Sequence, residues 1–195
     1  MSLFVIGLAG RAGSGKTLVA ERLQREWGAT CRPFAAPLKR MLRFFLEDQG
    51  CGLARAIEMT SGALKEEPTD YLGGATPRRA MQTLGAEWGR GLSPSLWVDA
   101  WRRAAEDKAL AASVDGSTVL VVADDLRFPN EVEAVRALGG IIIRIDRPGA
   151  GLTGAAGDHE SETADLGDPD MVIVNDGDLD RLFGRVDAIA AGVMD

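Results

Sequence analysis

Residues 3–17 read LFVIGLAGRAGSGKT, and this stretch decides the fold. Residues 3–9 are a continuous apolar run, which is typical of a strand buried on both faces of a parallel sheet. Residues 10–17 then match the pattern G-x-x-x-x-G-K-[ST] completely, and this pattern is typical of a loop whose backbone wraps around phosphate groups. Apolar residues recur at every fourth position from Val19 to Trp27, which predicts an amphipathic helix after the loop.

The loop predicts ATP and Mg²⁺ as ligands. Its backbone N–H groups and the N-terminus of the following helix would supply positive potential for phosphates. We expect Lys16 to act as a catalytic residue at the β- and γ-phosphates, and Thr17 to ligate Mg²⁺. A chance glycine loop beside a surface lysine is the alternative, but a strand precedes the motif and a helix follows it. The ATP-binding residues predicted here are Gly10, Arg11, Ala12, Gly13, Ser14, Gly15, Lys16 and Thr17.

Further buried strands are predicted late in the chain, by apolar runs at residues 118–123, 141–145 and 171–174. Helical patterns alternate with them, one starting at Pro129 and one over residues 179–189. Strands that alternate with helices indicate an α/β fold with a parallel sheet flanked by helices, and the loop makes this a P-loop NTPase fold.

The middle of the chain reads as mostly helical, with starts at Pro37, Thr76-Pro77 and Ser93-Pro94 and a loop over residues 60–75. We therefore expect one domain with a helical substrate-binding insertion and a short lid. The expected boundaries are a core of residues 1–33, 113–147 and 166–195, an insertion of about 34–112 and a lid of about 147–165.

Composition excludes several classes of protein. The 195 residues carry a net charge of −7, which argues against a broad nucleic-acid-binding or anionic-membrane surface. His159 is the only histidine, so a histidine-rich metal centre is excluded. Cys31 and Cys51 have no CxxC spacing and fit buried thiols in a reducing compartment. No apolar run is long enough for a membrane span, and the first residues lack the basic start of a signal peptide, so we expect a cytoplasmic protein.

Two acids, Asp124 and Asp125, come directly after the apolar run at residues 118–123. A carboxylate at the end of a buried strand can hold the hydration shell of Mg²⁺ beside a phosphate loop. The alternative is a pair of solvated or helix-capping carboxylates. The residues alone leave open which acid serves the metal, and strand geometry favours Asp124.

The sequence narrows the kind of P-loop protein. A GTPase would need N-K-x-D, but Asn130 and Asn175 are followed by Glu131 and Asp176, and the D-x-x-G match at residues 146–149 fits a turn better. A motor ATPase usually has a larger core. A small-molecule kinase needs an acceptor-binding insertion and a late loop that bears arginines, and this chain has both. Arg147, more than Arg144, is the expected lid residue that contacts the transferring phosphoryl group.

The chain resembles the bacteriophage-type deoxynucleoside monophosphate kinases, which belong to the adenylate-kinase-like P-loop kinases. The resemblance runs nearly end to end, and the TPR…QTLG and D-x-R-F-P-N-E segments are its most specific parts. The stretches that carry it are GRAGSGKT (10–17), FAAPLKRML (34–42), TPRRAMQTLGAEWGR (76–90) followed by Trp97, DLRFPNE (125–131), HESE (159–162) and VIVNDG (172–177).

The resemblance implies a binding site for a deoxynucleoside monophosphate (dNMP) and contacts to adenine after the last strand. Ala86 stands where the family more often has threonine. Alanine has no hydroxyl group, so a polar contact with the substrate at this position can come only from the backbone. The implied substrate-binding residues are Arg78, Arg79, Gly85, Ala86, Trp97, Asp125, Arg127 and Glu131, and the implied adenine-side residues are Asn175, Asp176 and Gly177.

Each implied role has a plainer alternative. From spacing alone Trp97 fits a helix core, Glu131 fits the first turn of a helix, and residues 175–177 fit a turn. Arg127 fits an ion pair with Asp125. His159 fits a loop residue better than a catalyst.

The expected function is ATP-dependent phosphorylation of a dNMP to the diphosphate by in-line transfer, with Lys16, Arg127 and Arg147 as catalytic residues. No strong base is needed, because the second pKa of a phosphate monoester is about 6. The alternatives are a kinase for another phosphorylated metabolite, of the dephospho-coenzyme A or phosphomevalonate type, and an ATP-binding regulatory or packaging module. We expect nucleotides as the partners, without nucleic acid or membrane, and a monomer or homodimer in the cytoplasm, of the host if the chain is phage-encoded.

Overall fold

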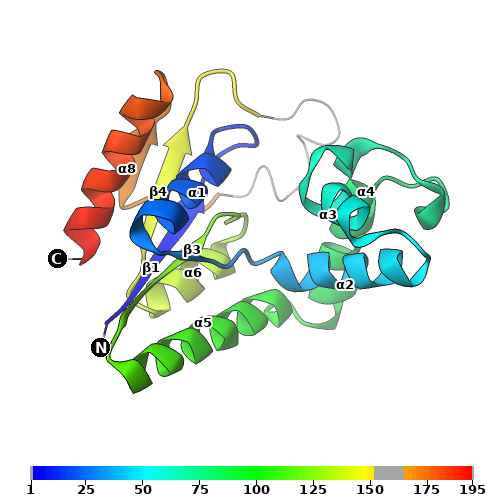
Figure 1. Ribbon diagram of the computed structural model, residues 1–195, viewed down its shortest axis with the longest axis horizontal. Coiled ribbons are helices and arrows are strands. Elements are labelled where there is room, and N and C mark those ends of the chain that lie inside the picture. Colours follow the sequence, from blue (N-terminus) through cyan, green and yellow to red (C-terminus); the bar gives the residue numbers. More distant parts are fainter. Residues whose placement is uncertain (1, 152–164, 195) are drawn as a thin grey trace. The chain divides into compact units, whose positions relative to one another are not determined.

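The central sheet is built around the apolar run near the N-terminus. The computed structural model describes residues 2–151 and 165–194. Its five-stranded sheet has the order β2-β3-β1-β4-β5, with β1 (Ser2–Ala9) in the middle (Figure 1). The other strands are β2 (Thr30–Cys31), β3 (Thr118–Ala123), β4 (Ile141–Asp146) and β5 (Met171–Val174).

All neighbouring strands are parallel, so their carboxyl ends meet at one edge of the sheet. In the register, Ile6 of β1 lies opposite Val122 of β3 on one side and Ile141 of β4 on the other. The predicted α/β fold with a parallel sheet flanked by helices is therefore confirmed. In such sheets the carboxyl edge is where ligands bind.

The helices lie where the sequence patterns place them, with some differences at the ends. Residues 60–75, expected as a loop, contain two short 3₁₀ turns, η1 (Ala63–Glu66) and η2 (Asp70–Leu72). The chain also has a π-helix, η3 (Leu84–Arg90). The α-helices are α1 (Lys16–Trp27), α2 (Ala36–Asp48), α3 (Leu53–Ser61), α4 (Pro77–Thr83), α5 (Leu96–Asp115), α6 (Pro129–Ala137) and α8 (Leu179–Met194). None of the helices in the described ranges is both long and apolar enough to span a bilayer.

One face of the sheet packs against α1 and α8. Val19 and Leu23 of α1 and Leu182 of α8 are fully or almost fully buried against sheet residues such as Leu8 and Val122. Side chains of a strand alternate between its two faces, so the strand residues between these core residues point to the opposite face of the sheet. Gly7 shows this, because an added Cβ there would meet Leu126 and Ile142 at 2.9–3.0 Å.

An ion-pair network joins α1 to α8. Arg22 donates through Nη2 and Nε to the Asp187 carboxylate, at 2.6 and 3.2 Å, and the Trp27 Nε1–H donates to the same group at 3.0 Å. The Arg22 guanidinium also lies 5.2 Å from the centre of the Phe183 ring. The hydrogen bonds from Arg22 and Trp27 lower the pKa of Asp187 below its ordinary value of 3.8.

Asp187→Ala is expected to lower Tm by about 2–4 °C at pH 7, because it removes these charge-assisted bonds between the two helices. A carboxyl whose pKa falls on folding stabilises the protein above its unfolded pKa, and that contribution is lost as pH falls through the folded value. Thermal unfolding followed by circular dichroism should therefore show the difference between wild type and variant shrinking below pH 4. Asp107→Ala, at an exposed position of α5, is the control. A difference in Tm that persists unchanged at low pH would show that the network does not act through its charge.

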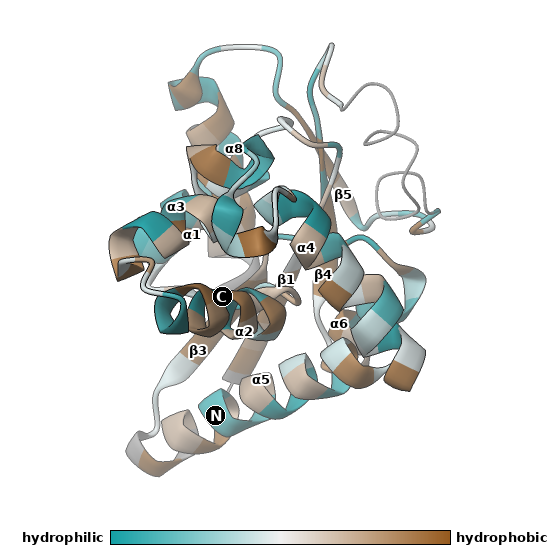
Figure 2. Cartoon of the chain, turned by 90° about the vertical axis from the view of Figure 1, so that its right-hand side faces the viewer, coloured by the Kyte–Doolittle hydropathy of each residue, from teal (hydrophilic) through white to brown (hydrophobic). Residues whose placement is uncertain are grey.

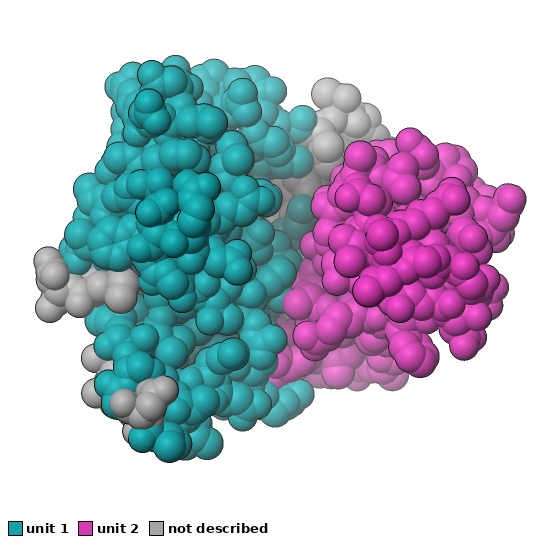
Figure 3. Space-filling model, in the orientation of Figure 1, with its two compact units in different colours: residues 1–34, 101–195 teal, residues 35–100 magenta. Residues whose placement is uncertain are grey.

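The chain divides into two compact units, residues 1–34 with 101–195 and residues 35–100, coloured separately in Figure 3. The second unit has its own small core around Leu42, Leu46 and Met59. Figure 2 shows hydrophilic and hydrophobic residues alternating along α5, as expected of a helix with one buried side.

Two predicted helix starts in the middle of the chain can be compared with the structure. Thr76 caps α4 as predicted, since its Oγ1 accepts a bond from the Arg79 N–H at 3.2 Å. The helix expected at Ser93-Pro94 begins later, at Leu96. The Leu96 N–H donates to the Ser93 carbonyl at 3.0 Å, so residues 93–96 form a turn ahead of the helix.

Candidate active site

Three glycines shape the loop between β1 and α1, at positions where other residues would fit poorly. Gly10, Gly13 and Gly15 have φ angles of +134°, +76° and +108°, in the region that side chains disfavour. An added Cβ at Gly10 would lie 2.4 Å from the Ile145 carbonyl oxygen. The Ser14 N–H donates to the Arg11 carbonyl at 3.1 Å and closes the turn. The loop therefore brings backbone N–H groups and the N-terminus of α1 to the carboxyl edge of the sheet, an arrangement that suits an anion.

Lys16 begins α1 and folds back over this loop. Its Nζ donates to the carbonyl oxygens of Gly10 and Arg11, at 2.6 and 2.9 Å. The carbonyls at the start of the loop lie within reach of the lysine and accept its hydrogen bonds.

Asp124 lies beyond the end of β3, which pairs directly with β1. Because side chains alternate along a strand, Asp124 continues the same face of the sheet as Val122, and this face packs against α1. Cys31 supports this placement, because its Sγ donates to the Ala20 carbonyl of α1 at 3.5 Å while burial and the Asp124 charge raise the pKa of its thiol to about 11. The Oδ1 atom of Asp124 is buried and has no hydrogen-bond partner among the described residues.

A buried carboxylate oxygen without a partner is costly, and a cation would remove that cost. Thr17 stands in the first turn of α1, on the helix that this face of the sheet packs against. Within residues 2–151 and 165–194 no three His, Cys, Asp or Glu side chains gather into a metal cluster. Mg²⁺ at nucleotide sites needs no such cluster, since it keeps several waters and binds substrate phosphates. Thr17 and Asp124 therefore fit Mg²⁺.

Two other acids at this edge hold backbone groups in place. Asp125 accepts a hydrogen bond from the Phe34 N–H at 2.7 Å. Glu131 is 4% exposed, and its Oε2 accepts bonds from the N–H groups of Arg127 and Phe128, at 2.8 and 3.2 Å. Glu131 thus caps α6 from its first turn. Contacts of these acids with a substrate stay predictions.

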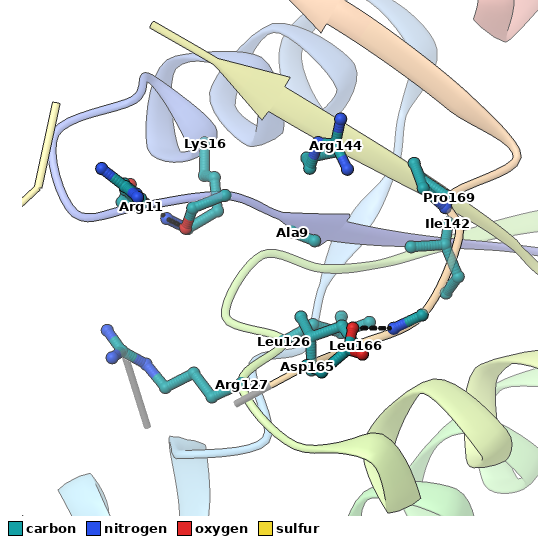
Figure 4. Close-up of a pocket in the computed structure, with 12 residues that line it drawn as sticks. Ala9, Arg11, Lys16, Leu126, Arg127, Ile142, Arg144, Asp165, Leu166 and Pro169 are labelled. Carbon is teal, nitrogen blue, oxygen red and sulfur yellow. Dashed lines mark hydrogen bonds between the residues drawn. The ribbon is translucent and has the colours of Figure 1, made fainter. Parts of the chain in front are cut away.

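Cationic side chains gather around two cavities beside the loop. The first has a volume of about 230 Å³, and Figure 4 shows Arg11, Lys16, Arg127 and Arg144 around it, with Leu126 and Ile142 as apolar lining. The second, of about 720 Å³, is lined by loop residues and by the segment after β4.

Arg147 lines one of these cavities and Arg144 lines both. Arg147 lines the larger one, and its Nη1 donates to the Gly13 carbonyl at 3.4 Å. Arg144, which the sequence ranks behind Arg147, lines both cavities. Its Nε donates to the two carboxylate oxygens of Asp146 at 3.1 and 3.2 Å. Guanidinium groups suit the charge spread over a transferring phosphoryl group.

Residues 175–177 follow β5 and lie against the phosphate loop. The Asn175 Nδ2 donates to the Ser14 carbonyl at 2.9 Å. Asp176 pairs with Arg181 and Arg185 of α8, at 3.6 and 3.5 Å. At Gly177, an added Cβ would lie 3.1 Å from Arg181. The structure thus brings the predicted adenine-side segment to the loop, and contacts with adenine stay a prediction.

The remaining predicted substrate residues belong to the unit of residues 35–100. Arg78 pairs with Glu66, and Arg79 is exposed. Trp97 is 6% exposed and its Nε1–H donates to the Gly85 carbonyl at 2.9 Å, so its indole packs inside this unit. Ala86 lies in the π-helix.

Sequence reasoning missed the π-helix and the features that accommodate the Trp97 ring. A Cβ on Gly89 would lie 2.3 Å from the Trp97 ring, so this glycine makes room for the indole. The sequence signal that could have indicated this packing is a glycine within a helical pattern, ahead of a tryptophan. Most of the expected lid, and His159 within it, lies outside the described residues.

A glycine loop after the central strand of a parallel sheet, with Asp124 beyond the end of the neighbouring β3 and arginines at the same edge, is the arrangement of a P-loop fold. The model of the deoxynucleotide monophosphate kinase family matches residues 71–186. A protein of Acanthamoeba polyphaga mimivirus, named "putative deoxynucleotide monophosphate kinase", is 30% identical over 194 residues, which are 94% of each chain. The chain belongs to the deoxynucleotide monophosphate kinase family, and the predicted resemblance is confirmed.

Solved structures align over nearly the whole chain at low identity. A Thermus thermophilus protein, TT1252, is 20% identical, with a TM-score of 0.48 and 99% of both chains covered. A protein of Chloroflexus aurantiacus described as a "putative kinase" is 12% identical, with a TM-score of 0.47 and 99% and 97% of the two chains covered.

Proposed function

We propose that this kinase transfers the γ-phosphate of ATP to a deoxynucleoside monophosphate, forming ADP and the deoxynucleoside diphosphate. Membership of the family supports the acceptor class. The observation that carries the ATP side is the glycine loop at the N-terminus of α1, together with the buried Oδ1 of Asp124 beyond the end of β3, which has no hydrogen-bond partner in the part of the chain that the structure describes. A triphosphate and its cation are the ligands that suit these two features together.

Thr17 and Asp124 are the residues that we propose hold Mg²⁺. When bound, the ion would neutralise charge on the β- and γ-phosphates. The Asp124 oxygen has no hydrogen bond to give up among the described residues, so binding a cation or its water shell there breaks no protein contact.

The chain's own residues would bind and orient the phosphates. Loop N–H groups from Gly10 to Thr17 would bind the β-phosphate, and Lys16 would exchange its two carbonyl partners for phosphate oxygens. Arg127 and Arg147 would stabilise charge on the transferring group from the two cavities that they line. Catalysis of this kind depends on positioning and charge more than on proton transfer.

In the reaction, an oxygen of the acceptor's phosphate forms a bond to the γ-phosphorus, and the bond from that phosphorus to the β–γ bridging oxygen breaks. ADP leaves with the electron pair of the broken bond. The acceptor phosphate is largely ionised at neutral pH, with a second pKa of about 6, so no protein base has to remove a proton.

The acceptor contacts belong to the same proposal. We propose a substrate set in which arginines bind the acceptor phosphate and the other residues fix the nucleoside. This set is Arg78, Arg79, Gly85, Ala86, Trp97, Asp125, Arg127 and Glu131, with Asn175, Asp176 and Gly177 on the ATP side. The partners proposed are small-molecule nucleotides, without nucleic acid or membrane, for a cytoplasmic monomer or homodimer.

A substrate panel tests the proposal. The purified protein is incubated with ATP and Mg²⁺ and with each ribo- or deoxynucleoside monophosphate in turn, and ADP formation is followed by a coupled assay. We expect ADP only when a dNMP is added, with preferences among bases set by the shape of the pocket. ADP formation that does not depend on a nucleotide acceptor would contradict the proposal, and so would activity with dephospho-coenzyme A or phosphomevalonate alone.

A further inference from the structure

Asn175 makes two hydrogen bonds that connect the end of β5 to neighbouring structure. Its backbone N–H donates to the carbonyl of Asp146, the last residue of β4, at 2.7 Å. Its side-chain Nδ2 donates to the carbonyl of Ser14 inside the phosphate loop, at 2.9 Å. Because a carbonyl oxygen only accepts, the NH₂ end of the amide is the end that faces the loop.

The bond to Ser14 fixes the orientation of one peptide group of the loop. A trans peptide is planar, and its C=O and N–H groups point in opposite directions. Since the Ser14 carbonyl is held toward Asn175, the N–H of Gly15 points away from Asn175. That N–H stands immediately before Lys16, the first residue of α1. It therefore belongs to the set of N–H groups that a phosphate at the helix N-terminus would meet.

The contact is close enough to restrict the residue at position 15. A Cβ on Gly15 would lie 2.7 Å from the Asn175 Nδ2, and the φ angle of Gly15 is +108°. A side chain at position 15 would therefore displace Asn175 from the loop. Glycine at this position serves both the backbone turn and the approach of the asparagine.

We propose that Asn175 is a positioning residue that holds the Ser14–Gly15 peptide in the orientation that binds the triphosphate. This inference rests on the proposed binding of ATP by the loop. It differs from a contact with adenine, which the sequence predicts for this segment, because the donor end of the amide is directed to the loop.

Asn175→Ala tests the proposal, with two ligands measured by titration calorimetry in the presence of Mg²⁺. One is ATP and the other is inorganic tripolyphosphate, which has no nucleoside. The loss of one hydrogen bond that orients the loop should weaken both by the same factor, about threefold to tenfold. The dNMP KM should stay unchanged. Val172→Ala, at an exposed position of β5 that lines neither cavity, is the control and should bind both ligands like the wild type.

Weaker binding of ATP with unchanged binding of tripolyphosphate would place Asn175 against the nucleoside and overturn the proposal. Unchanged binding of both ligands would also overturn it.

A second measurement is independent of ATP binding. In the ligand-free protein, Asn175→Ala should speed hydrogen exchange of the Ser14 N–H, which bonds to the Arg11 carbonyl, by about threefold or more. Exchange in β1 should not change. If loop exchange is faster but neither the wild type nor the variant binds ATP, the proposed function fails and the positioning contact stands. If loop exchange is the same in variant and wild type, the positioning role is wrong.

Discussion

Lys16→Ala is expected to lower kcat/KM by about three orders of magnitude, the largest effect that we predict. The ammonium would bear directly on the β- and γ-phosphates, where charge develops during transfer, and the loss of one such donor typically costs 10²–10³-fold in rate. Steady-state kinetics with ATP and the best dNMP measures the change. Lys108→Ala removes an exposed lysine from α5 and should leave the kinetics unchanged.

The fold should survive this substitution. In the structure Lys16 bonds to the carbonyls of Gly10 and Arg11, which water can satisfy in the variant. Tm should therefore change by no more than about 2 °C. A folded variant with activity near that of the wild type would remove the loop from the proposed catalytic site.

Asp124→Asn and Asp125→Asn are expected to give different results, and the first is the second-largest effect. Asp124 has a buried oxygen that no group within residues 2–151 and 165–194 hydrogen-bonds, and it lies on the α1 side of the sheet. Its neutralisation should therefore raise the Mg²⁺ concentration needed for half-maximal rate by about 10- to 100-fold. Asp125 instead accepts a bond from the Phe34 N–H, which an asparagine oxygen also accepts. Its substitution should change the KM for dNMP more than the Mg²⁺ requirement.

Initial rates over a Mg²⁺ titration separate the two variants. Asp107→Asn, at an exposed position of α5, is the matched control and should follow the wild-type curve. Equal Mg²⁺ curves for the Asp124 variant and the wild type would mean that the metal is held elsewhere.

The fold could be predicted because its strands are short and mostly apolar. The apolar run at residues 118–123 predicted β3 with the bounds observed in the structure, and the run at residues 171–174 predicted the bounds of β5. A strand covered on both faces needs apolar residues at every position, as the last four residues of β3 have. In β5 the run is equally apolar, although three of its four residues are exposed. The glycines of the loop were equally readable, since a positive φ or a close backbone approach leaves few other choices.

Features that depend on the meeting of distant residues could not be predicted. Asn175 is 161 positions away from Ser14, and nothing local in N-D-G indicates that the amide would bond to a loop near the other end of the chain. The burial of Glu131 and its two backbone bonds also depend on how the segment before α6 folds back. The π-helix contains Gly89, which lies against the Trp97 ring, and helical periodicity does not indicate either feature.

Transfer of label from ATP carrying ³²P in the γ-position tests the central claim most directly. The purified protein, Mg²⁺ and one dNMP at a time are incubated, and the nucleotides are separated. We expect label to appear in the deoxynucleoside diphosphate, one label for each ADP formed, and Lys16→Ala to slow its appearance by about three orders of magnitude. Label released as inorganic phosphate, or retained in ATP with every dNMP tested, would contradict it.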